Sequence, residues 1–236
     1  LRRRIPAARE RASKHPLWPK LKEFQKDGVA RMVAAKGIVK GQLLADEMGL
    51  GKTLQALVVY GVLKPKRALF VCPAYLRSNL EHEIKDKWGI GAPEVLREIK
   101  DRPSSNLVIV SYSWMKHDSN QEFLQSQRYD FVCFDEAHAM KHGFHSRASA
   151  CSKVYRVGLK VARLAEYVLC VTATPSCGYT KEFYSYCTFL DPNVLRFKPF
   201  AERYCNRKKS PFGNGFDDNG SSCTDELKAY LAPYRI

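Results

Sequence analysis

The chain has 236 residues, a length that suits one α/β domain or one domain with an appendage, and its hydrophobic content of 45% is sufficient for a core. Its 39 Lys and Arg outnumber 24 Asp and Glu and give a formal net charge of +15. This excess indicates nucleic acid as the first partner, ahead of an anionic membrane surface or simple solubility. No apolar run reaches the ~18 residues of a membrane-spanning helix, so we expect no membrane partner.

The cysteines argue against a metal or disulfide framework. Eight are present, none in a C-x-x-C pair, and Cys72, Cys133 and Cys170 fall within apolar runs where cysteine behaves as a small hydrophobe. We therefore expect a reduced, intracellular compartment. The chain begins without Met or an apolar signal-peptide core, so we expect it to be part of a longer protein.

The first 20 residues are strongly basic. Residues 1–22 hold eight Lys or Arg and one acid, Glu10. The pattern favours a solvated N-terminal arm, with an arm that contacts nucleic acid as the alternative. The apolar residues that follow, from Phe24 to Val33, have the spacing of one helical face and predict a helix over about 22–36.

A candidate phosphate-binding loop comes next, between the apolar run 43–45 and the apolar-periodic segment 53–63. Its residues are Asp46, Glu47, Met48, Gly49, Leu50, Gly51, Lys52 and Thr53. Glycines let backbone N–H groups crowd around an anion at a helix N-terminus. Lys52 is expected to reach the β- and γ-phosphates of ATP, and the Thr53 hydroxyl to ligate Mg²⁺. Asp46 departs from the usual GxxxxGK[ST] pattern, which has Gly there. The alternative is a glycine turn before a helix with a surface lysine.

Four further apolar runs alternate with helical patterns. They are residues 68–72, 107–110, 131–134 and 167–171. Strands that are apolar throughout are buried on both faces, and their alternation with helices predicts a parallel, doubly wound sheet of the α/β class. In such sheets the functional residues follow the carboxyl ends of the strands. Polar clusters follow all four runs, so we expect them at the same rim of the sheet as Lys52.

An acidic pair follows the run 131–134. Asp135 is expected to hold Mg²⁺ through water, and Glu136 to orient and deprotonate the attacking water. The alternative is that both acids only cap the next helix. His138 is expected to bridge Glu136 to the loop 172–174, with a purely structural histidine as the alternative.

These segments carry a family resemblance. Residues 46–53, 135–138 (Asp-Glu-Ala-His) and 172–175 (Thr-Ala-Thr-Pro) resemble motifs I, II and III of superfamily-two helicases. They are most similar to the Swi/Snf-type DNA translocases, in which Asp-Glu-Met-Gly-Leu-Gly-Lys-Thr is a specific signature that includes Asp46. The resemblance covers about residues 20–236 and implies an N-terminal RecA-like ATPase lobe with a P-loop. Residues 200–228 are more similar to the annealing-helicase and fork-remodelling branch.

The resemblance also implies individual roles. Residues 24–29 resemble the Q motif of that family, which implies that Gln25 reads adenine. Residues 72–76 with Trp88 resemble motif Ia, and residues 110–112 resemble motif Ib. The residues that the resemblance places on nucleic acid are Pro73, Tyr75, Ser111, Tyr112, Thr172 and Thr174.

The resemblance implies a DNA-dependent ATPase that uses ATP and Mg²⁺ for translocation on double-stranded DNA, in chromatin or on branched DNA, and in the nucleus if the organism is eukaryotic. The expected division is a basic arm (1–20), a RecA-like lobe (21–190) and a mostly helical and looped appendage (191–236). The appendage leads toward a second lobe that the sequence does not contain. Because that lobe supplies the arginine fingers, we expect the isolated chain to hydrolyse ATP weakly.

Two other functions stay open. One is an RNA helicase of the same superfamily, which shares the Asp-Glu-Ala-His sequence. The other is a nucleic-acid-binding scaffold with a vestigial ATPase. Basic side chains between 153 and 163 favour a solvated helix face over a DNA track, and those between 196 and 209 form a second basic cluster. Phosphate contacts by either set would be independent of base sequence and sensitive to salt.

Overall fold

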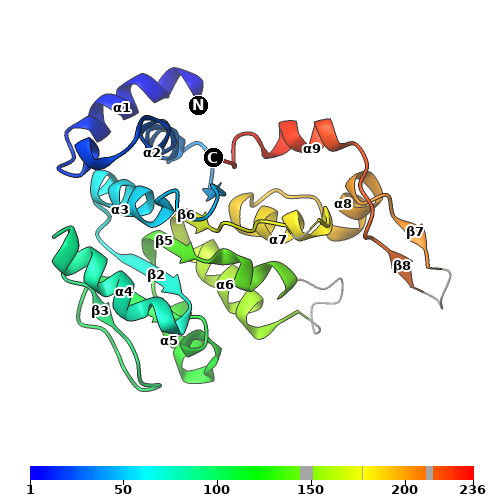
Figure 1. Ribbon diagram of the computed structural model, residues 1–236. Coiled ribbons are helices and arrows are strands. Elements are labelled where there is room, and N and C mark those ends of the chain that lie inside the picture. The colour runs from blue at the N-terminus through cyan, green and yellow to red at the C-terminus, as the bar shows by residue number, and fades with distance from the viewer. Residues whose placement is uncertain (144–150, 177, 211–214) are drawn as a thin grey trace.

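The computed structural model describes residues 1–143, 151–176, 178–210 and 215–236. Its centre is a parallel sheet with the strand order β1-β6-β5-β2-β4-β3 (Figure 1). The strands are β1 (Gly41–Leu44), β2 (Ala68–Cys72), β3 (Glu94–Val95), β4 (Leu107–Ser111), β5 (Tyr129–Asp135) and β6 (Ala165–Val171). The predicted parallel α/β sheet is confirmed, and every predicted apolar run forms a strand. The short edge strand β3 is an addition to the prediction.

Helices cover both faces of the sheet, as a doubly wound fold requires. One face packs against α2 (Glu23–Ala35), α3 (Lys52–Leu63) and α4 (Arg77–His82), and α1 (Ile5–Ser13) lies outside them on α2 and α3. The other packs against α5 (Asp118–Ser126), α6 (Lys153–Leu164) and α7 (Lys181–Leu190). Successive strand residues point to opposite faces, so Phe70 and Phe131 lie under the first layer while Val71 and Val132 lie under the second. Cys72, Cys133 and Cys170 are buried in the strands, as expected.

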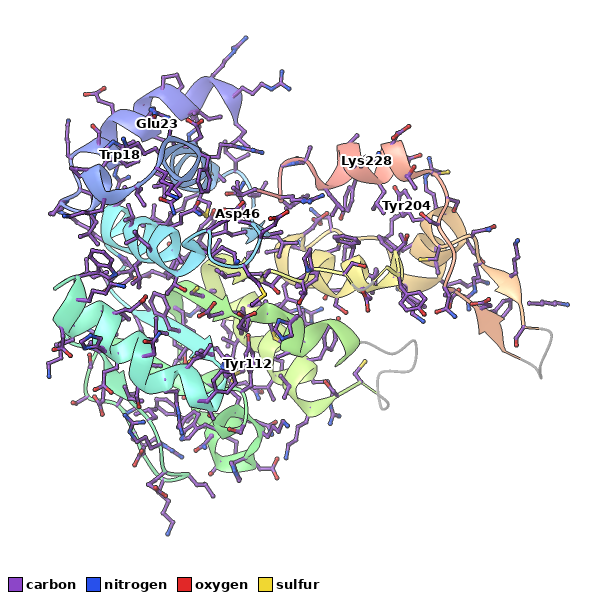
Figure 2. The ribbon with its side chains drawn as sticks, viewed as in Figure 1. Trp18, Glu23, Asp46, Tyr112, Tyr204 and Lys228 are labelled. Carbon is purple, nitrogen blue, oxygen red and sulfur yellow. The ribbon has the colours of Figure 1, made fainter. Side chains whose placement is uncertain are left out.

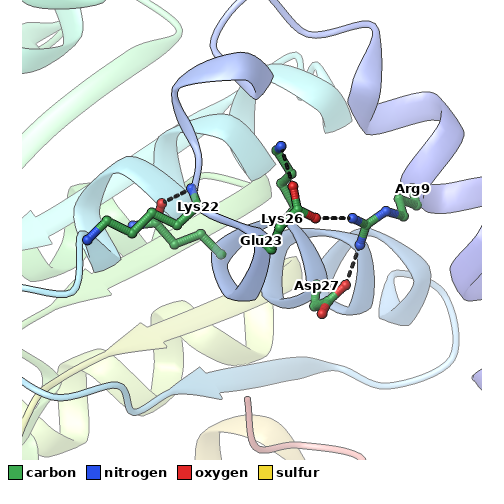
Figure 3. Close-up of polar contacts among 6 residues, drawn as sticks. Arg9, Lys22, Glu23, Lys26 and Asp27 are labelled. Atoms are coloured by element: carbon green, nitrogen blue, oxygen red, sulfur yellow. Dashed lines mark hydrogen bonds and ion pairs between the residues drawn. The ribbon is translucent and has the colours of Figure 1, made fainter.

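The basic N-terminal segment lies against the domain instead of extending from it as a solvated arm. Ala8 and Ala12 of α1 are buried where this helix packs on α2. Arg9 donates a hydrogen bond to Glu23 with 2.8 Å between Nη2 and Oε2, and it also pairs with Asp27 (Figure 3). The short apolar side chains, one helical turn apart, let the two helices approach closely and so dock the segment. The arginines 2–4 stay exposed.

Residues 191–236 form a smaller unit beside α7. It contains α8 (Phe197–Tyr204), an antiparallel ribbon of β7 (Lys208–Lys209) and β8 (Phe216–Asp217), and α9 (Thr224–Leu231). Figure 2 shows Tyr204 on α8 near Lys228 on α9. The aromatic rings of Tyr184, Phe200 and Tyr204 pack edge to face, with centroids 5.0 Å apart in each neighbouring pair, and Leu227 completes this cluster.

The last residues return to the sheet. The Leu43 N–H donates to the Tyr234 carbonyl at 2.6 Å, and the Ile236 N–H donates to the Leu43 carbonyl at 2.9 Å. The segment therefore lies along the free edge of β1, the strand that leads into the loop 46–53. No helix in the described part of the chain is long and apolar enough to cross a membrane.

Candidate nucleotide-binding site

A cavity of about 440 Å³ opens at the carboxyl ends of the strands. On one side it is lined by the loop after β1 and the first turn of α3, and on another by Asp135 and Glu136 after β5. Ala173, after β6, also contributes. The sequence places Lys52 and Asp135 far apart along the chain, and the sheet order brings them to one cavity. The expectation that these groups share a rim is confirmed.

The loop 46–53 has the backbone that its glycines predict. Gly49 and Gly51 have φ angles of +77° and +70°, in the left-handed region that glycine adopts without strain. A Cβ at Gly51 would lie 2.5 Å from Nε2 of Gln25, so no side chain fits there without displacement. The turn presents the N-terminus of α3, with its unpaired backbone N–H groups, to the cavity.

Lys52 lies over this loop. Its Nζ donates to the carbonyl oxygens of Asp46 at 2.9 Å and Glu47 at 2.7 Å. The ammonium group is therefore held at the N-terminus of α3, beside the glycine turn. An anion bound at this turn would meet the positive end of the helix dipole and the Lys52 charge together, so the loop fits a polyphosphate.

The acid pair ends strand β5. Burial, and then the neighbouring Glu136 carboxylate, raise the pKa of Asp135 to about 6, although Lys52 and a hydrogen bond from the Glu136 N–H act in the opposite direction. Its negative charge is thus only partly compensated by the protein. Carboxylate and hydroxyl oxygens are ligands that suit Mg²⁺, and Thr53 lines the same cavity, so the residues present fit this ion.

Backbone strain accompanies the acid pair. Glu136 has φ of +50°, which is unusual for a residue with a side chain and is associated with functional sites. The Tyr112 hydroxyl donates to the carbonyl of Asp135 at 2.8 Å and stabilises this turn. The arrangement keeps Glu136 at the cavity wall.

His138 connects two of the motifs. Its Nδ1 lies 3.0 Å from Oε2 of Glu136 and 3.3 Å from Oγ1 of Thr172. Thr172 Oγ1 also accepts a hydrogen bond from the N–H of Thr174 at 3.1 Å. The contacts anticipated for His138 are therefore present, and they join the end of β5 to the end of β6.

Gln25 lies behind the loop and not in the cavity. It is buried, and its Oε1 accepts from the Lys22 N–H at 2.7 Å, an N-terminal cap of α2. Its Nε2 donates to the Leu50 carbonyl at 2.8 Å, so one amide connects α2 to the phosphate-binding loop. An amide nitrogen carries two hydrogens, which leaves a second N–H for a ligand.

The residues expected on nucleic acid divide into two groups. Tyr75 is 79% exposed, Thr174 is exposed and Pro73 is half-buried, so these three are accessible. Ser111, Tyr112 and Thr172 have 1%, 6% and 0% of their surface exposed. This is a correction: the side chains of these last three face internal partners. Tyr112 bonds to the carbonyl of Asp135 and Thr172 to the neighbouring loop, whereas Ser111 bonds to Ser113 and the Trp114 N–H.

Several cavity residues were not predicted. Asn79, Glu83 and Lys87 line the cavity, together with Trp88, which the sequence had assigned to the segment that resembles motif Ia. Residues Glu83–Lys87 form a π-helix, a local change of helix register that is frequent at functional sites. The register change moves Glu83 and Lys87 away from α-helical positions, so helical periodicity gave no signal for them, whereas Asn79 lies on α4 before the change. Gln55 does not line the cavity but bonds to Asp46 of the loop, and it did have a sequence signal as a polar residue inside the apolar helix 53–63.

Comparisons with known proteins agree with this geometry. A SWI/SNF-related matrix-associated actin-dependent regulator of chromatin subfamily A-like protein 1 from Drosophila melanogaster is 32% identical over 235 residues, covering 96% of this chain and 29% of that protein. The human DNA annealing helicase and endonuclease ZRANB3 is 30% identical over 233 residues, covering 93% of this chain and 21% of its own length. The chain thus spans less than a third of these relatives.

A solved structure gives the same fold. The Sulfolobus solfataricus SWI2/SNF2 ATPase core in complex with dsDNA matches with a TM-score of 0.73 at 24% identity, covering 92% of this chain and 44% of that one. Residues 24–235 match the family described as SNF2-related domain. The Swi/Snf-type resemblance, including the annealing-helicase branch, is therefore confirmed. The chain belongs to the SNF2-related domain family.

Proposed function

We propose that this chain binds ATP with Mg²⁺ in the rim cavity and forms the first ATPase lobe of a motor that translocates on double-stranded DNA. The observation that carries the proposal is the meeting of Lys52, the N-terminus of α3 and the acid pair Asp135–Glu136 in one cavity. Positive groups for a polyphosphate and negative groups for a cation are thereby adjacent, which is the arrangement that phosphoryl transfer needs.

The roles of individual residues follow from their positions. The backbone of residues 46–51 and Lys52 hold the phosphates, and Thr53 and Asp135 hold Mg²⁺. When bound, the ion neutralises charge that develops on the transferred phosphoryl group. Glu136 orients the attacking water and accepts its proton. Gln25 supports the loop from behind, and its second amide hydrogen is proposed to contact an adenine ring that lies outside the rim cavity.

His138 is proposed to communicate between nucleotide and DNA. It contacts Glu136 in the nucleotide cavity and Thr172 in the loop that carries the exposed Thr174. A change in the position of Glu136 would therefore alter the loop 172–174. Pro73, Tyr75 and Thr174 are the DNA contacts that the exposure of the side chains supports.

Double-stranded DNA is the partner that the comparisons favour. The Sulfolobus core was solved with dsDNA, and the human relative is named a DNA annealing helicase. No observation favours RNA. The chromatin and DNA names of the relatives support a nuclear location if the organism is eukaryotic.

A second lobe is part of the proposal. We propose the division into residues 1–20, 21–190 and 191–236, in which the first lobe ends at Leu190, the last residue of α7. Arginine fingers from the second lobe can raise the rate by about 10³–10⁵. The 236-residue chain is accordingly proposed to bind ATP and hydrolyse it slowly.

Binding of a fluorescent ATP analogue, with and without Mg²⁺, tests the site in the chain itself. Lys52→Ala should weaken binding at least about tenfold, because it removes a charge that contacts the phosphates. Glu136→Gln should retain binding. Equal affinity of the wild-type chain and the Lys52→Ala variant would contradict the proposed site.

ATP hydrolysis by the longer protein tests the motor. Duplex DNA should stimulate hydrolysis more than single-stranded RNA, and Glu136→Gln should abolish turnover while ATP still binds. Stronger stimulation by RNA would favour the helicase alternative. Unchanged DNA-dependent function in Glu136→Gln would favour the scaffold.

A further inference from the structure

The basic cluster at residues 196–209 separates into paired and unpaired cations. Arg203 binds the Glu226 carboxylate with both nitrogens, at 2.7 Å for Nη2, and Arg207 lies 3.4 Å from Asp218. These two arginines hold the local structure together and are not available to a ligand. Lys208 and Lys209 form strand β7 and are exposed, and neither ammonium group has a partner among the described residues.

An exposed aromatic ring stands beside these lysines. Phe216 in β8 is 53% exposed, and the Arg207 guanidinium lies over its ring, 4.2 Å from the centroid. Lys209 is the cross-strand partner of Phe216, so these two side chains share one face of the ribbon. The Arg207 contact covers one side of the ring and holds it in place, and the exposed part of the ring remains open to a ligand.

The ribbon has a fixed base even though its strands are short. The Ser222 N–H donates to the Tyr204 carbonyl at 2.9 Å, and the Asn206 N–H donates to Oγ of Ser222 at 3.0 Å. Lys181 of α7 donates to Asn219 at 2.5 Å. A two-stranded ribbon is marginally stable by itself, and these bonds connect it to α7 and α8. Figure 1 shows β7 and β8 projecting from α8, away from the sheet.

We propose that the face of the β7–β8 ribbon formed by Phe216 and Lys209 binds an unpaired nucleotide next to duplex DNA. The base stacks on the exposed side of the Phe216 ring, and a neighbouring phosphate contacts Lys209, whereas Lys208 points to the opposite face of the ribbon. A base inside a duplex is covered by its neighbours on both sides, so only an unpaired base can offer its face to the ring. The inference rests on the proposed DNA motor and assigns to the ribbon the contact with the single-stranded part of its substrate.

Fluorescence anisotropy with the 236-residue chain tests this assignment. A blunt duplex is compared with a tailed duplex that has the same number of phosphates, at one fixed salt concentration, because affinity falls steeply with salt. Phe216→Ala should weaken binding of the tailed DNA about tenfold and leave the blunt duplex nearly unchanged. Phe216→Leu keeps an apolar side chain but removes the aromatic ring, so it should weaken binding of the tailed DNA as much. Phe216→Tyr keeps a ring and should retain the wild-type affinity for the tailed DNA.

Lys209 has a matched control. Lys209→Gln should lower the salt dependence of binding, by about one in the slope of log K against log salt, while Lys228→Gln on α9 should not. Lys228 is exposed, and among the described residues it pairs only with Asp225 in its own helix.

A direct readout in the wild-type chain avoids reliance on variant folding. The fluorescence of 2-aminopurine, placed in the tail next to the duplex, should be quenched on binding through stacking on Phe216. If the 2-aminopurine fluorescence is not quenched, or if Phe216→Ala binds both DNAs with wild-type affinity, the inference is overturned.

Binding of a protein at the ribbon with no effect on DNA would also overturn it. Normal binding of the blunt duplex in these experiments leaves the proposed motor standing, whereas loss of all DNA binding by the wild-type chain contradicts the motor.

Discussion

The side-chain amide of Gln55 donates a hydrogen bond to the carboxylate of Asp46, with 2.9 Å between Nε2 and Oδ2. Asp46 occupies the position where a phosphate-binding loop usually has Gly, and its own carbonyl accepts from Lys52. Gln55 is fully buried on α3. The unusual residue of the loop is therefore anchored from the helix that follows it, and the anchor also fixes a carbonyl that holds the lysine.

Removal of this hydrogen bond should destabilise the chain and weaken ATP binding. Gln55→Leu and Asp46→Ala each lose a bond to a charged group, about 1.5–3 kcal/mol, and the double variant should lose less than the sum. Urea unfolding of the wild type, the two single variants and the double variant gives the coupling energy.

Gln42→Leu is the matched control, since Gln42 is equally buried but bonds to Pro233 and Tyr167. It should reduce stability and spare ATP affinity. If the losses of stability in Gln55→Leu and Asp46→Ala simply add in the double variant, the two residues are not coupled.

The two glycines of the loop should respond unequally to alanine. Both have a left-handed backbone, so each substitution costs about 1–2 kcal/mol of strain. A Cβ at Gly49 meets nothing within 4 Å, whereas at Gly51 it lies 2.5 Å from the Gln25 amide. Thermal unfolding and ATP affinity should therefore show a larger loss in Gly51→Ala than in Gly49→Ala. Gln25→Ala should remove most of the difference, and equal losses in the two alanine variants would disprove the steric contact.

Much of the fold and of the nucleotide site was predictable because the signals are local. Uniformly apolar runs predict parallel strands that are buried on both faces, and polar residues directly after them must lie at one rim. Lys52, Asp135 and Glu136 follow from this rule without any knowledge of contacts. The helix over 22–36 was predicted from apolar residues spaced for one helical face, and it is observed as Glu23–Ala35.

The remaining features depend on contacts between distant segments. The direction of the Tyr112 side chain depends on the Asp135 carbonyl, 23 residues away, and no local pattern encodes it. The pairing of residues 234–236 with Leu43 has the same origin. The docking of α1 did have a local signal, Ala8 and Ala12 at i, i+4, but the surrounding charges made a solvated arm the simpler prediction.

Stability should depend on pH through Asp135. Burial and Glu136 raise its pKa from 3.8 to about 6, so the folded chain prefers the protonated acid, and stability falls as pH rises from about 4 through 6. Asp135→Asn imitates the protonated form. It should stabilise the Mg²⁺-free chain by about 1–3 kcal/mol at pH 8, with a smaller gain at pH ~5.

A second aspartate, Asp118, serves as a control because its pKa is shifted in the opposite direction. Hydrogen bonding and charge from Lys153 lower the pKa of Asp118, so its contribution is present above its unfolded pKa and is lost as pH falls. Asp118→Asn should therefore destabilise the chain at pH 8 and have less effect near pH ~4. Thermal unfolding in the presence of a chelator measures both variants. A pH-independent gain in Asp135→Asn would show that its charge is not the cause.

Of the two tyrosines predicted to contact DNA, Tyr112 should contribute to stability and Tyr75 to DNA binding. The Tyr112 hydroxyl is buried and bonds to the carbonyl of Asp135, so Tyr112→Phe should lower the free energy of unfolding by about 1 kcal/mol and leave affinity for duplex DNA unchanged. Tyr75 is 79% exposed, so Tyr75→Ala should have little effect on unfolding and should weaken DNA binding. Urea unfolding and anisotropy on the same preparations measure both quantities. If Tyr112→Phe instead reduces DNA affinity at unchanged stability, its hydroxyl must leave the acid pair when DNA binds, and the end of strand β4 would then be part of the DNA-binding surface.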